Sequence, residues 1–95
     1  MKITRQIRIR GRVQGVGFRD ALRREAIMQG CSGWGRNRLD GSVEAVVQGS
    51  EAAVRAVVDW SHRGPPASKV TSVETTDAQS EHDRTYVQFD FLKTV

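Results

Sequence analysis

Nine residues near the start of the chain have the types and spacing of an anion-binding site. They run Gly11-Arg12-Val13-Gln14-Gly15-Val16-Gly17-Phe18-Arg19. Glycine adopts the left-handed backbone conformation that other residues avoid, so Gly15 and Gly17 can form a turn whose successive N–H groups converge on one ligand. A helix beginning near Phe18 would add unpaired N–H groups and the positive end of its dipole. Arg19 supplies a planar, permanently charged guanidinium that suits phosphate or carboxylate oxygens.

The loop does not match the common nucleotide-binding patterns. G-x-x-x-x-G-K-[ST] requires a lysine followed by a hydroxyl residue, which residues 11–19 lack. G-x-G-x-x-G would require glycine where the chain has Asp20. Spacing alone therefore leaves two interpretations open: a phosphate or carboxylate site, and an ordinary strand-to-helix turn.

Hydrophobic periodicity predicts the elements on either side of the loop. Along residues 7–13, apolar or small side chains alternate with Arg8, Arg10 and Arg12, as in a strand with one buried and one wet face. From Phe18 the spacing becomes helical, and Gly30 is a stop signal. The helical positions are Phe18, Ala21, Leu22 and Ala26.

A hairpin, a second helix and two short strands are expected next. Residues 31–37 and 42–48 flank a turn that contains Asp40-Gly41. Ser50 is a good N-cap for a helix that Gly64-Pro65-Pro66 ends. Residues 70–76 and the alternating Val87, Phe89 and Phe91 predict the last strands, joined by a polar connection over residues 78–83.

This order predicts an α+β fold. A βαββα succession followed by two short strands, with right-handed crossovers, gives a ferredoxin-like two-layer α/β sandwich. Its sheet is mostly antiparallel, and both helices lie on one face. The pattern leaves the pairing of the last two strands open.

Length and composition favour one domain over residues 1–95. The start lacks an apolar stretch behind a charged lead, and no run approaches the ~18 apolar residues of a membrane span. Cys31 is the single cysteine, so no disulfide can form within the chain, which favours the cytoplasm, and we expect Cys31 to be a small buried hydrophobe. His62 and His82 have no metal-ligand spacing and are expected at the surface.

Positive charge is concentrated in the first part of the chain. Residues 1–38 carry ten basic and two acidic side chains, whereas residues 39–95 carry five basic and nine acidic ones. The positively charged part of the chain, which favours anionic ligands, is therefore the part that contains the loop. A basic face could also bind nucleic acid or a membrane surface, or these arginines could simply form a solvated surface.

Two separate motifs give the chain a resemblance to the acylphosphatase family. The first is the loop of residues 11–19. The second comprises Gly33-Trp34 and Arg36-Asn37-Arg38 running into Asp40-Gly41-Ser42-Val43-Glu44. The likeness continues through Gln48-Gly49, Gly64-Pro65-Pro66 and Val73-Glu74, and so covers nearly the whole chain.

The resemblance implies a ferredoxin-like enzyme that hydrolyses acyl phosphates to a carboxylate and inorganic phosphate without metal or cofactor. By position, Arg19 corresponds to the family's phosphate-binding arginine and Asn37 to the asparagine that holds the attacking water. The phosphate-binding residues expected on this basis are Gln14, Gly15, Val16, Gly17, Phe18 and Arg19. The implied partners are a small acyl phosphate and an oxyanion in the loop, with no nucleic acid or membrane, and the implied state is a monomer.

Two positions depart from the family's usual pattern. Asp20 stands where a bulky, often aromatic residue is usual, and its charge could repel a phosphate or compete for Arg19. Gly35 stands where a β-branched residue is usual, and Gly33 and Gly35 together should weaken the strand that holds Asn37. These departures predict a weakened affinity for the substrate or a mobile second strand over residues 31–37.

Two other functions are compatible with the sequence. RNA-recognition domains share the βαββαβ order, but they stack bases on exposed sheet aromatics, and residues 42–48 contain no aromatic residue. Trp34 and Trp60 are expected at the core or its edge rather than on a stacking surface. The other alternative is a non-catalytic domain that binds an acyl phosphate within a larger assembly.

Overall fold

The computed structural model describes residues 2–78, 82 and 84–95. Its elements follow the expected order, with the last strand shorter than predicted. They are β1 (Lys2–Arg12), α1 (Phe18–Met28), β2 (Ser32–Asn37), β3 (Val43–Ser50), α2 (Glu51–Ser61), β4 (Lys69–Asp77) and β5 (Phe89–Phe91).

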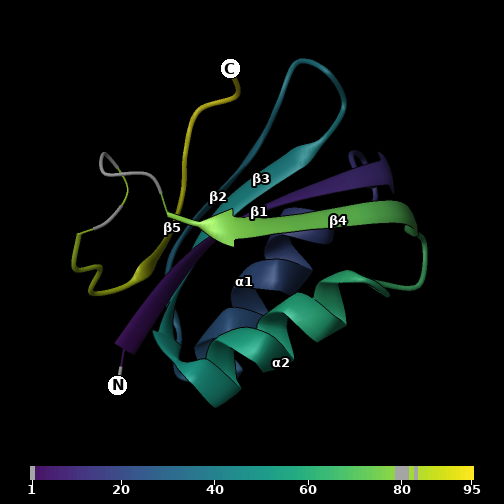
Figure 1. Cartoon of the computed structure of the whole chain (residues 1–95). Helices are drawn as coiled ribbons and strands as arrows, with labels where there is room; N and C mark the ends of the chain where they lie inside the picture. The colour runs from purple at the N-terminus through teal and green to yellow at the C-terminus, as the bar shows by residue number, and fades with distance from the viewer. Residues whose placement is uncertain (1, 79–81, 83) are drawn as a thin grey trace.

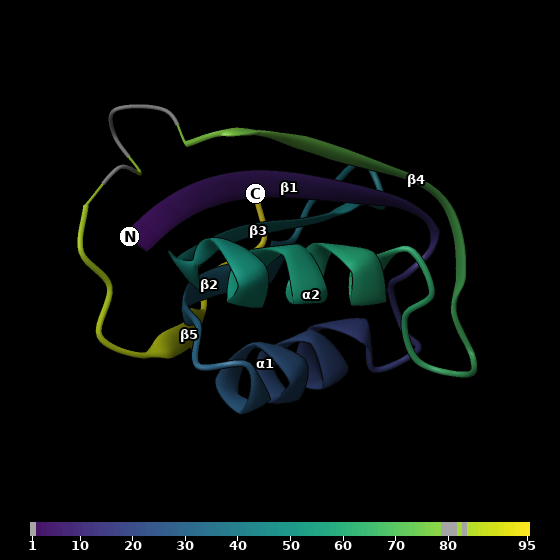
Figure 2. The ribbon, with the colours of Figure 1, turned by 60° about the horizontal axis from the view of Figure 1, so that its bottom comes forward.

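The five strands form one sheet, and both helices cover the same face of it (Figures 1 and 2). The strand order is β4-β1-β3-β2-β5. Every pairing is antiparallel except that of β5 with β2, which is parallel. The predicted ferredoxin-like α+β sandwich, with its mostly antiparallel sheet, is confirmed.

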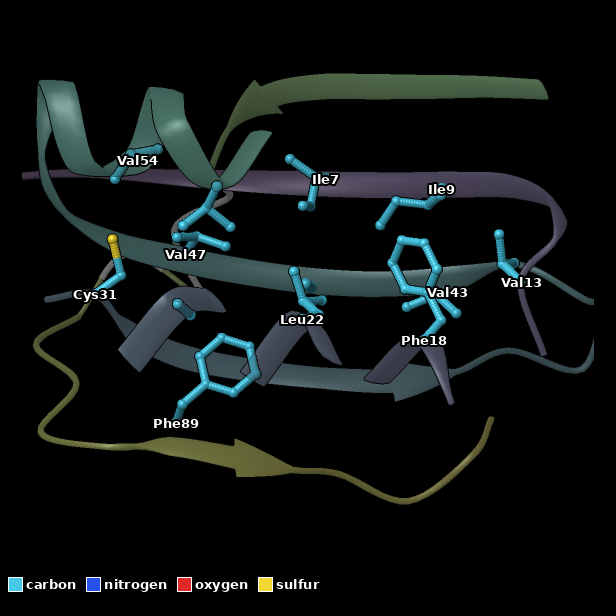
Figure 3. Close-up of a cluster of buried hydrophobic side chains, with 13 residues drawn as sticks. Ile7, Ile9, Val13, Phe18, Leu22, Cys31, Val43, Val47, Val54 and Phe89 are labelled. Carbon is cyan, nitrogen blue, oxygen red and sulfur yellow. The ribbon is translucent and has the colours of Figure 1, made fainter. Parts of the chain in front are cut away.

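The core lies between the helices and this face of the sheet (Figure 3). β1 contributes Ile7 and Ile9, and α1 contributes Phe18 and Leu22, all of them almost fully buried. Cys31 is also buried in this cluster, as predicted. The central strand β3 places Val43, Ala45 and Val47 in the core, so alternation puts Glu44, Val46 and Gln48 on the opposite face.

Local signals fix the helix ends. Gly17 caps α1 with φ +77°, and Gly30 follows the helix with φ +79°, both in the left-handed region that favours glycine. Ser50 caps α2 through its hydroxyl, which accepts a hydrogen bond of 3.1 Å from the Ala53 N–H. Neither helix in the described part of the chain has the length and apolar character needed to span a bilayer.

The last two strands pair at opposite edges of the sheet. β4 joins β1, whereas β5 joins β2 and buries Phe89 in the core. The strand expected from residue 87 is reduced to three residues, and Val87 lies outside it and is exposed. Residues 79–81 and 83 of the expected polar connection lie outside the described residues, but His82 is half-buried with its ring 5.2 Å from that of Trp34.

The sheet face away from the helices is partly covered. Trp34 is only 3% exposed there, and Arg8 is half-buried, whereas Arg10 and Arg12 are exposed. Trp60, on α2, instead packs against Phe18 with the two ring centroids 5.4 Å apart. Both tryptophans are therefore packed residues, as expected.

Candidate active site

A cavity of about 140 Å³ lies where the glycine loop meets the end of β2. It brings together Arg19, from the first turn of α1, and Asn37, the last residue of β2. Its lining consists of Val13, Gly15, Gly17, Phe18, Arg19, Asp20, Asn37 and Phe91. The cavity therefore contains the two side chains singled out by the separate sequence motifs.

The loop presents free backbone donors. Gly15 and Gly17 have φ values of +74° and +77°. The first hydrogen bond of α1 runs from the Ala21 N–H to the Gly17 carbonyl at 3.1 Å, and the N–H groups of residues 15–19 have no acceptor within the described part of the chain. Unpaired N–H groups in left-handed turns and at helix starts attract anions. This end of the cavity therefore suits an oxyanion.

Phe18 fixes the start of the helix by its side chain. Its ring is buried in the core, while Gly17 and Arg19 on either side of it line the cavity. Gly64 contributes to this packing, because a Cβ there would collide with the Phe18 ring. The buried side chain of Phe18 thus anchors the loop to the core.

Gln14 joins the loop to the hairpin. Its Nε2 donates hydrogen bonds to the carbonyl oxygens of Arg38 at 2.7 Å and Ser42 at 2.9 Å. Both amide hydrogens are therefore in use. Gln14 and Val16 do not line the cavity, so a contribution from either to anion binding would come through its backbone N–H.

Asn37 is held by the residues on either side of it. Arg36 Nε and Arg38 Nη1 lie 2.9 Å and 3.1 Å from Glu44 Oε1, on the sheet face opposite the helices. Since side chains alternate along a strand, the residue between them projects to the cavity side. The Asn37 amide makes no hydrogen bond to another described side chain, which leaves its carbonyl and N–H groups available to a bound molecule.

Glu44 is the buried centre of this ionic cluster. Its carboxylate also accepts a 2.6 Å hydrogen bond from Gln6 Nε2, and Arg8 Nη2 lies 3.6 Å away. Burial pushes the pKa of Glu44 upward, but the hydrogen bonds from Arg36 and Gln6 and the charges of Arg36 and Arg38 outweigh it and lower the pKa. Glu44 is thus ionised at neutral pH and keeps its arginine partners on that face.

The turn after Asn37 is fixed by Asp40. Its Oδ1 accepts hydrogen bonds from the Ser42 hydroxyl at 2.6 Å and the Ser42 N–H at 2.9 Å. These bonds, with the nearby charge of Arg8, lower the pKa of Asp40 to about 2. The turn therefore keeps its shape at any pH where Asp40 is ionised.

Asp20 lines the cavity beside Arg19. Both residues are in the described part of the chain, and they do not form an ion pair with each other. Asp20 is exposed in the first turn of α1, where a negative charge stabilises the helix dipole. Arg19 instead contacts the ring of Phe91, with its Cζ 5.5 Å from the ring centroid. The Arg19 N–H groups thus remain available to an anion.

Two residues of this site were missed at the sequence level, Phe91 and Glu44. Phe91 enters the cavity only because β5 pairs with β2, and no sequence signal specified that pairing. The position of Glu44 could have been found from the hairpin register, which places it opposite Arg36. In the described part of the chain, no group of three or more His, Cys, Asp or Glu side chains could hold a metal ion.

Comparisons with known proteins point to one family. The sequence model of the acylphosphatase family matches residues 5–91. An acylphosphatase from Thiobacillus denitrificans is 52% identical over 79 residues, which cover 83% of this chain and 89% of that protein.

Solved structures show the same fold. The crystal structure of acylphosphatase from Bacillus subtilis superposes with a TM-score of 0.87 at 36% identity, covering 98% of this chain and 100% of that one. Full-length HypF in its phosphate- and nucleotide-bound form superposes with a TM-score of 0.88 at 25% identity, covering 99% of this chain but 12% of the HypF chain. The family model and the 52% identical relative show that this chain belongs to the acylphosphatase family of enzymes.

Proposed function

We propose that this chain hydrolyses the carboxyl-phosphate bond of acyl phosphates, with Arg19 and the loop holding the phosphoryl group and Asn37 orienting the water. The observation that carries this proposal is the meeting of Arg19 and Asn37 in one cavity of a family member. We further propose that it works as a single domain over residues 1–95, as a cytoplasmic monomer without cofactor, metal or nucleic-acid partner.

The phosphoryl group binds at the loop end of the cavity. Backbone N–H groups of residues 15–19 donate to its oxygens, and Arg19 adds a charge that persists at neutral pH. In a loose transition state the charge spreads over the three equatorial oxygens, so donors fixed around them lower the barrier. Binding and catalysis therefore use the same groups.

Asn37 orients the nucleophile at the other end. Its amide carbonyl accepts a hydrogen bond from a water molecule and its N–H groups can donate one, which aligns the water for in-line attack on phosphorus. The new P–O bond forms as the bond to the acyl oxygen breaks, and the electron pair leaves on the carboxylate. The water proton passes to a phosphoryl oxygen.

This chemistry needs neither a strong general acid nor a strong general base. A carboxylate is a stable leaving group without protonation, and the phosphoryl oxygens themselves accept the proton from water. The described residues that line the cavity fit this expectation, because Arg19 and Asp20 are the only titratable side chains among them. Asp20 is exposed in the first turn of α1.

A second candidate function is binding of an acyl phosphate without turnover. The observation that favours it is the HypF comparison, in which almost all of this chain matches a small part of a much longer protein. The two candidates share the anion site and differ in whether a bound acyl phosphate is hydrolysed. They are therefore separated by one assay of binding and one of hydrolysis.

The experiment combines benzoyl phosphate hydrolysis in the presence of a chelator with thermal melting in inorganic phosphate. Phosphate at ten times its dissociation constant stabilises a protein by ~1.4 kcal/mol. For a domain of this size that corresponds to a rise of roughly 6 to 11 °C in melting temperature. Hydrolysis together with a melting-temperature shift that disappears in Arg19→Ala supports the enzyme. A shift without hydrolysis supports the binding domain. If neither hydrolysis nor a shift is observed, the proposed anion site is refuted.

A further inference from the structure

Phe91 at the end of β5 contacts two arginines of α1. The Cζ atoms of Arg19 and Arg23 lie 5.5 Å and 5.1 Å from its ring centroid. Phe91 also lines the cavity and is 38% exposed. One ring thus lies next to the proposed phosphate-binding arginine and to a second cation one helical turn away.

Arg19 and Arg23 would otherwise repel each other. Like charges four residues apart on a helix face are destabilising, and a free arginine turns its guanidinium away from its neighbour. The face of an aromatic ring carries partial negative charge and attracts both cations. Phe91 therefore offsets the repulsion at the point where Arg19 must stay near the loop.

The backbone of β5 ties this ring to the rest of the site. The Leu92 N–H donates to the Gly35 carbonyl at 2.9 Å, and the Leu39 N–H donates to the Val95 carbonyl at 2.9 Å. These two bonds bracket Asn37 on β2. The ring next to Arg19 is thus carried by a segment fixed to the strand that ends at Asn37.

We propose that Phe91 is a positioning residue for Arg19, an inference that rests on the proposed function. A ring contact engages the face of a guanidinium, whereas phosphate oxygens bind its N–H edges, so both can occur together. The ring restricts the rotamers of Arg19 before the anion arrives, which reduces the entropy lost on binding. Phe91 acts on binding and hydrolysis only through Arg19.

The test compares inorganic phosphate affinity and benzoyl phosphate KM in Phe91→Leu, Phe91→Trp and Leu92→Ala. Leucine keeps apolar bulk without a π face, so we expect Phe91→Leu to weaken phosphate binding and raise KM about threefold to tenfold. Tryptophan keeps the π face and should stay within about twofold of the wild type. Leu92 is also 38% exposed on the same segment, so Leu92→Ala controls for lost apolar surface and should leave both constants unchanged.

A double variant that combines Arg19→Ala with Phe91→Leu separates this inference from the proposed function. In Arg19→Ala, adding Phe91→Leu should weaken phosphate binding no further, whereas a further loss would overturn the positioning role. An active, Arg19-dependent wild type with unchanged affinity in Phe91→Leu would overturn this inference alone. A wild type that neither binds phosphate nor hydrolyses benzoyl phosphate would overturn the proposed function and this inference with it.

A measurement on the wild type keeps the proposal testable if Phe91→Leu does not fold. The Arg19 Nε–Hε resonance should be shifted by the ring current of Phe91, and it should return towards its ordinary position in any folded Phe91 variant without a ring. An Arg19 resonance at the ordinary position in the wild type would show that the contact does not persist in solution and would overturn the proposal.

Discussion

The side-chain amide of Gln14 lies 2.7 Å from the Arg38 carbonyl oxygen and links the glycine loop to the hairpin turn. The same nitrogen also donates to the Ser42 carbonyl at 2.9 Å. Gly15 follows Gln14 directly, and Asn37 precedes Arg38 directly. These two hydrogen bonds therefore set the spacing between the loop that we propose holds the anion and the strand end that we propose holds the water.

Replacing Gln14 should separate these two parts of the site. Gln14→Glu keeps the size of the side chain but removes both donors, and two carbonyl oxygens lose their partner. We expect a loss of about 1 to 3 kcal/mol in unfolding free energy and a tenfold or greater fall in kcat/KM for an acyl phosphate. Denaturant unfolding and steady-state kinetics measure the two effects, and a Gln14→Glu enzyme equal to the wild type in both would refute the linking role.

Neutralising Asp20 should strengthen phosphate binding. Its carboxylate lines the cavity without an ion pair to Arg19, so it repels the phosphate dianion through space. We expect Asp20→Asn to bind inorganic phosphate about twofold to threefold more tightly at low salt, with a smaller gain at high salt. Glu51→Gln, at the first turn of α2, is the matched control because it removes a helix-start charge away from the cavity. No gain in Asp20→Asn, or an equal gain in Glu51→Gln, would count against the repulsion.

The two glycines of β2 should respond in opposite ways to alanine. A Cβ at Gly35 would lie at ordinary contact distance, 3.6 Å from the Phe89 ring and 3.8 Å from Leu22. We expect Gly35→Ala to stabilise the fold by about 0.5 to 1 kcal/mol and to hydrolyse at least as fast as the wild type, because Asn37 two residues on is held more firmly.

Gly33→Ala is the matched contrast. Gly33 has φ +137°, and a Cβ there would collide with the Val46 carbonyl oxygen. We expect it to destabilise the protein by more than about 1 kcal/mol. Chemical denaturation of both variants checks this pair, and a Gly35→Ala protein less stable than the wild type would show that the strand needs glycine at both positions.

Acid should weaken the cluster around Glu44. Its folded-state pKa is lower than the ordinary value of 4.5, so its contribution is full above that pH and is lost as the pH falls through the folded-state pKa. We expect Glu44→Gln to lose on the order of 2 kcal/mol at pH 7, because it leaves arginines unpaired, and to lose less relative to the wild type at pH 3.

Glu74→Gln is the control for the acid experiment. Glu74 pairs with Arg10 at 3.2 Å, but its side chain is 61% exposed, so the pair contributes little. Urea unfolding of the three proteins from pH 3 to 7 measures the difference. A Glu44→Gln deficit that stays constant over this range would contradict an ionised Glu44 as the source of the stability.

Local sequence signals predicted most of the fold. Helical spacing from Phe18, the Ser50 cap and the glycines at 17 and 30 act within a few residues of each other, so they can be recognised without the tertiary structure. The pairing of β5 could not be predicted in this way. A three-residue parallel strand has few backbone hydrogen bonds of its own, and its place depends on the burial of Phe89 against α1 and β2.

The candidate site also combines residues that local motifs predict with residues whose place depends on tertiary packing. Arg19 and Asn37 came from motifs that resemble those of a family, and the structure places both in one cavity. The hydrogen bonds of Gln14 could not be derived, because an amide in a loop can equally face solvent. Phe91 could not be assigned either, because its position depends on the unpredicted pairing of β5.

The central claim is that Arg19 holds the anion while Asn37 serves only the attacking water. The most direct test measures inorganic phosphate affinity and benzoyl phosphate turnover side by side in the wild type, Arg19→Ala and Asn37→Ala. We expect Arg19→Ala to bind phosphate at least about tenfold more weakly and to lose turnover, and Asn37→Ala to bind phosphate within about threefold of the wild type while kcat falls at least about a hundredfold. Turnover that survives both substitutions, or equal loss of phosphate binding in both variants, would contradict this division of roles.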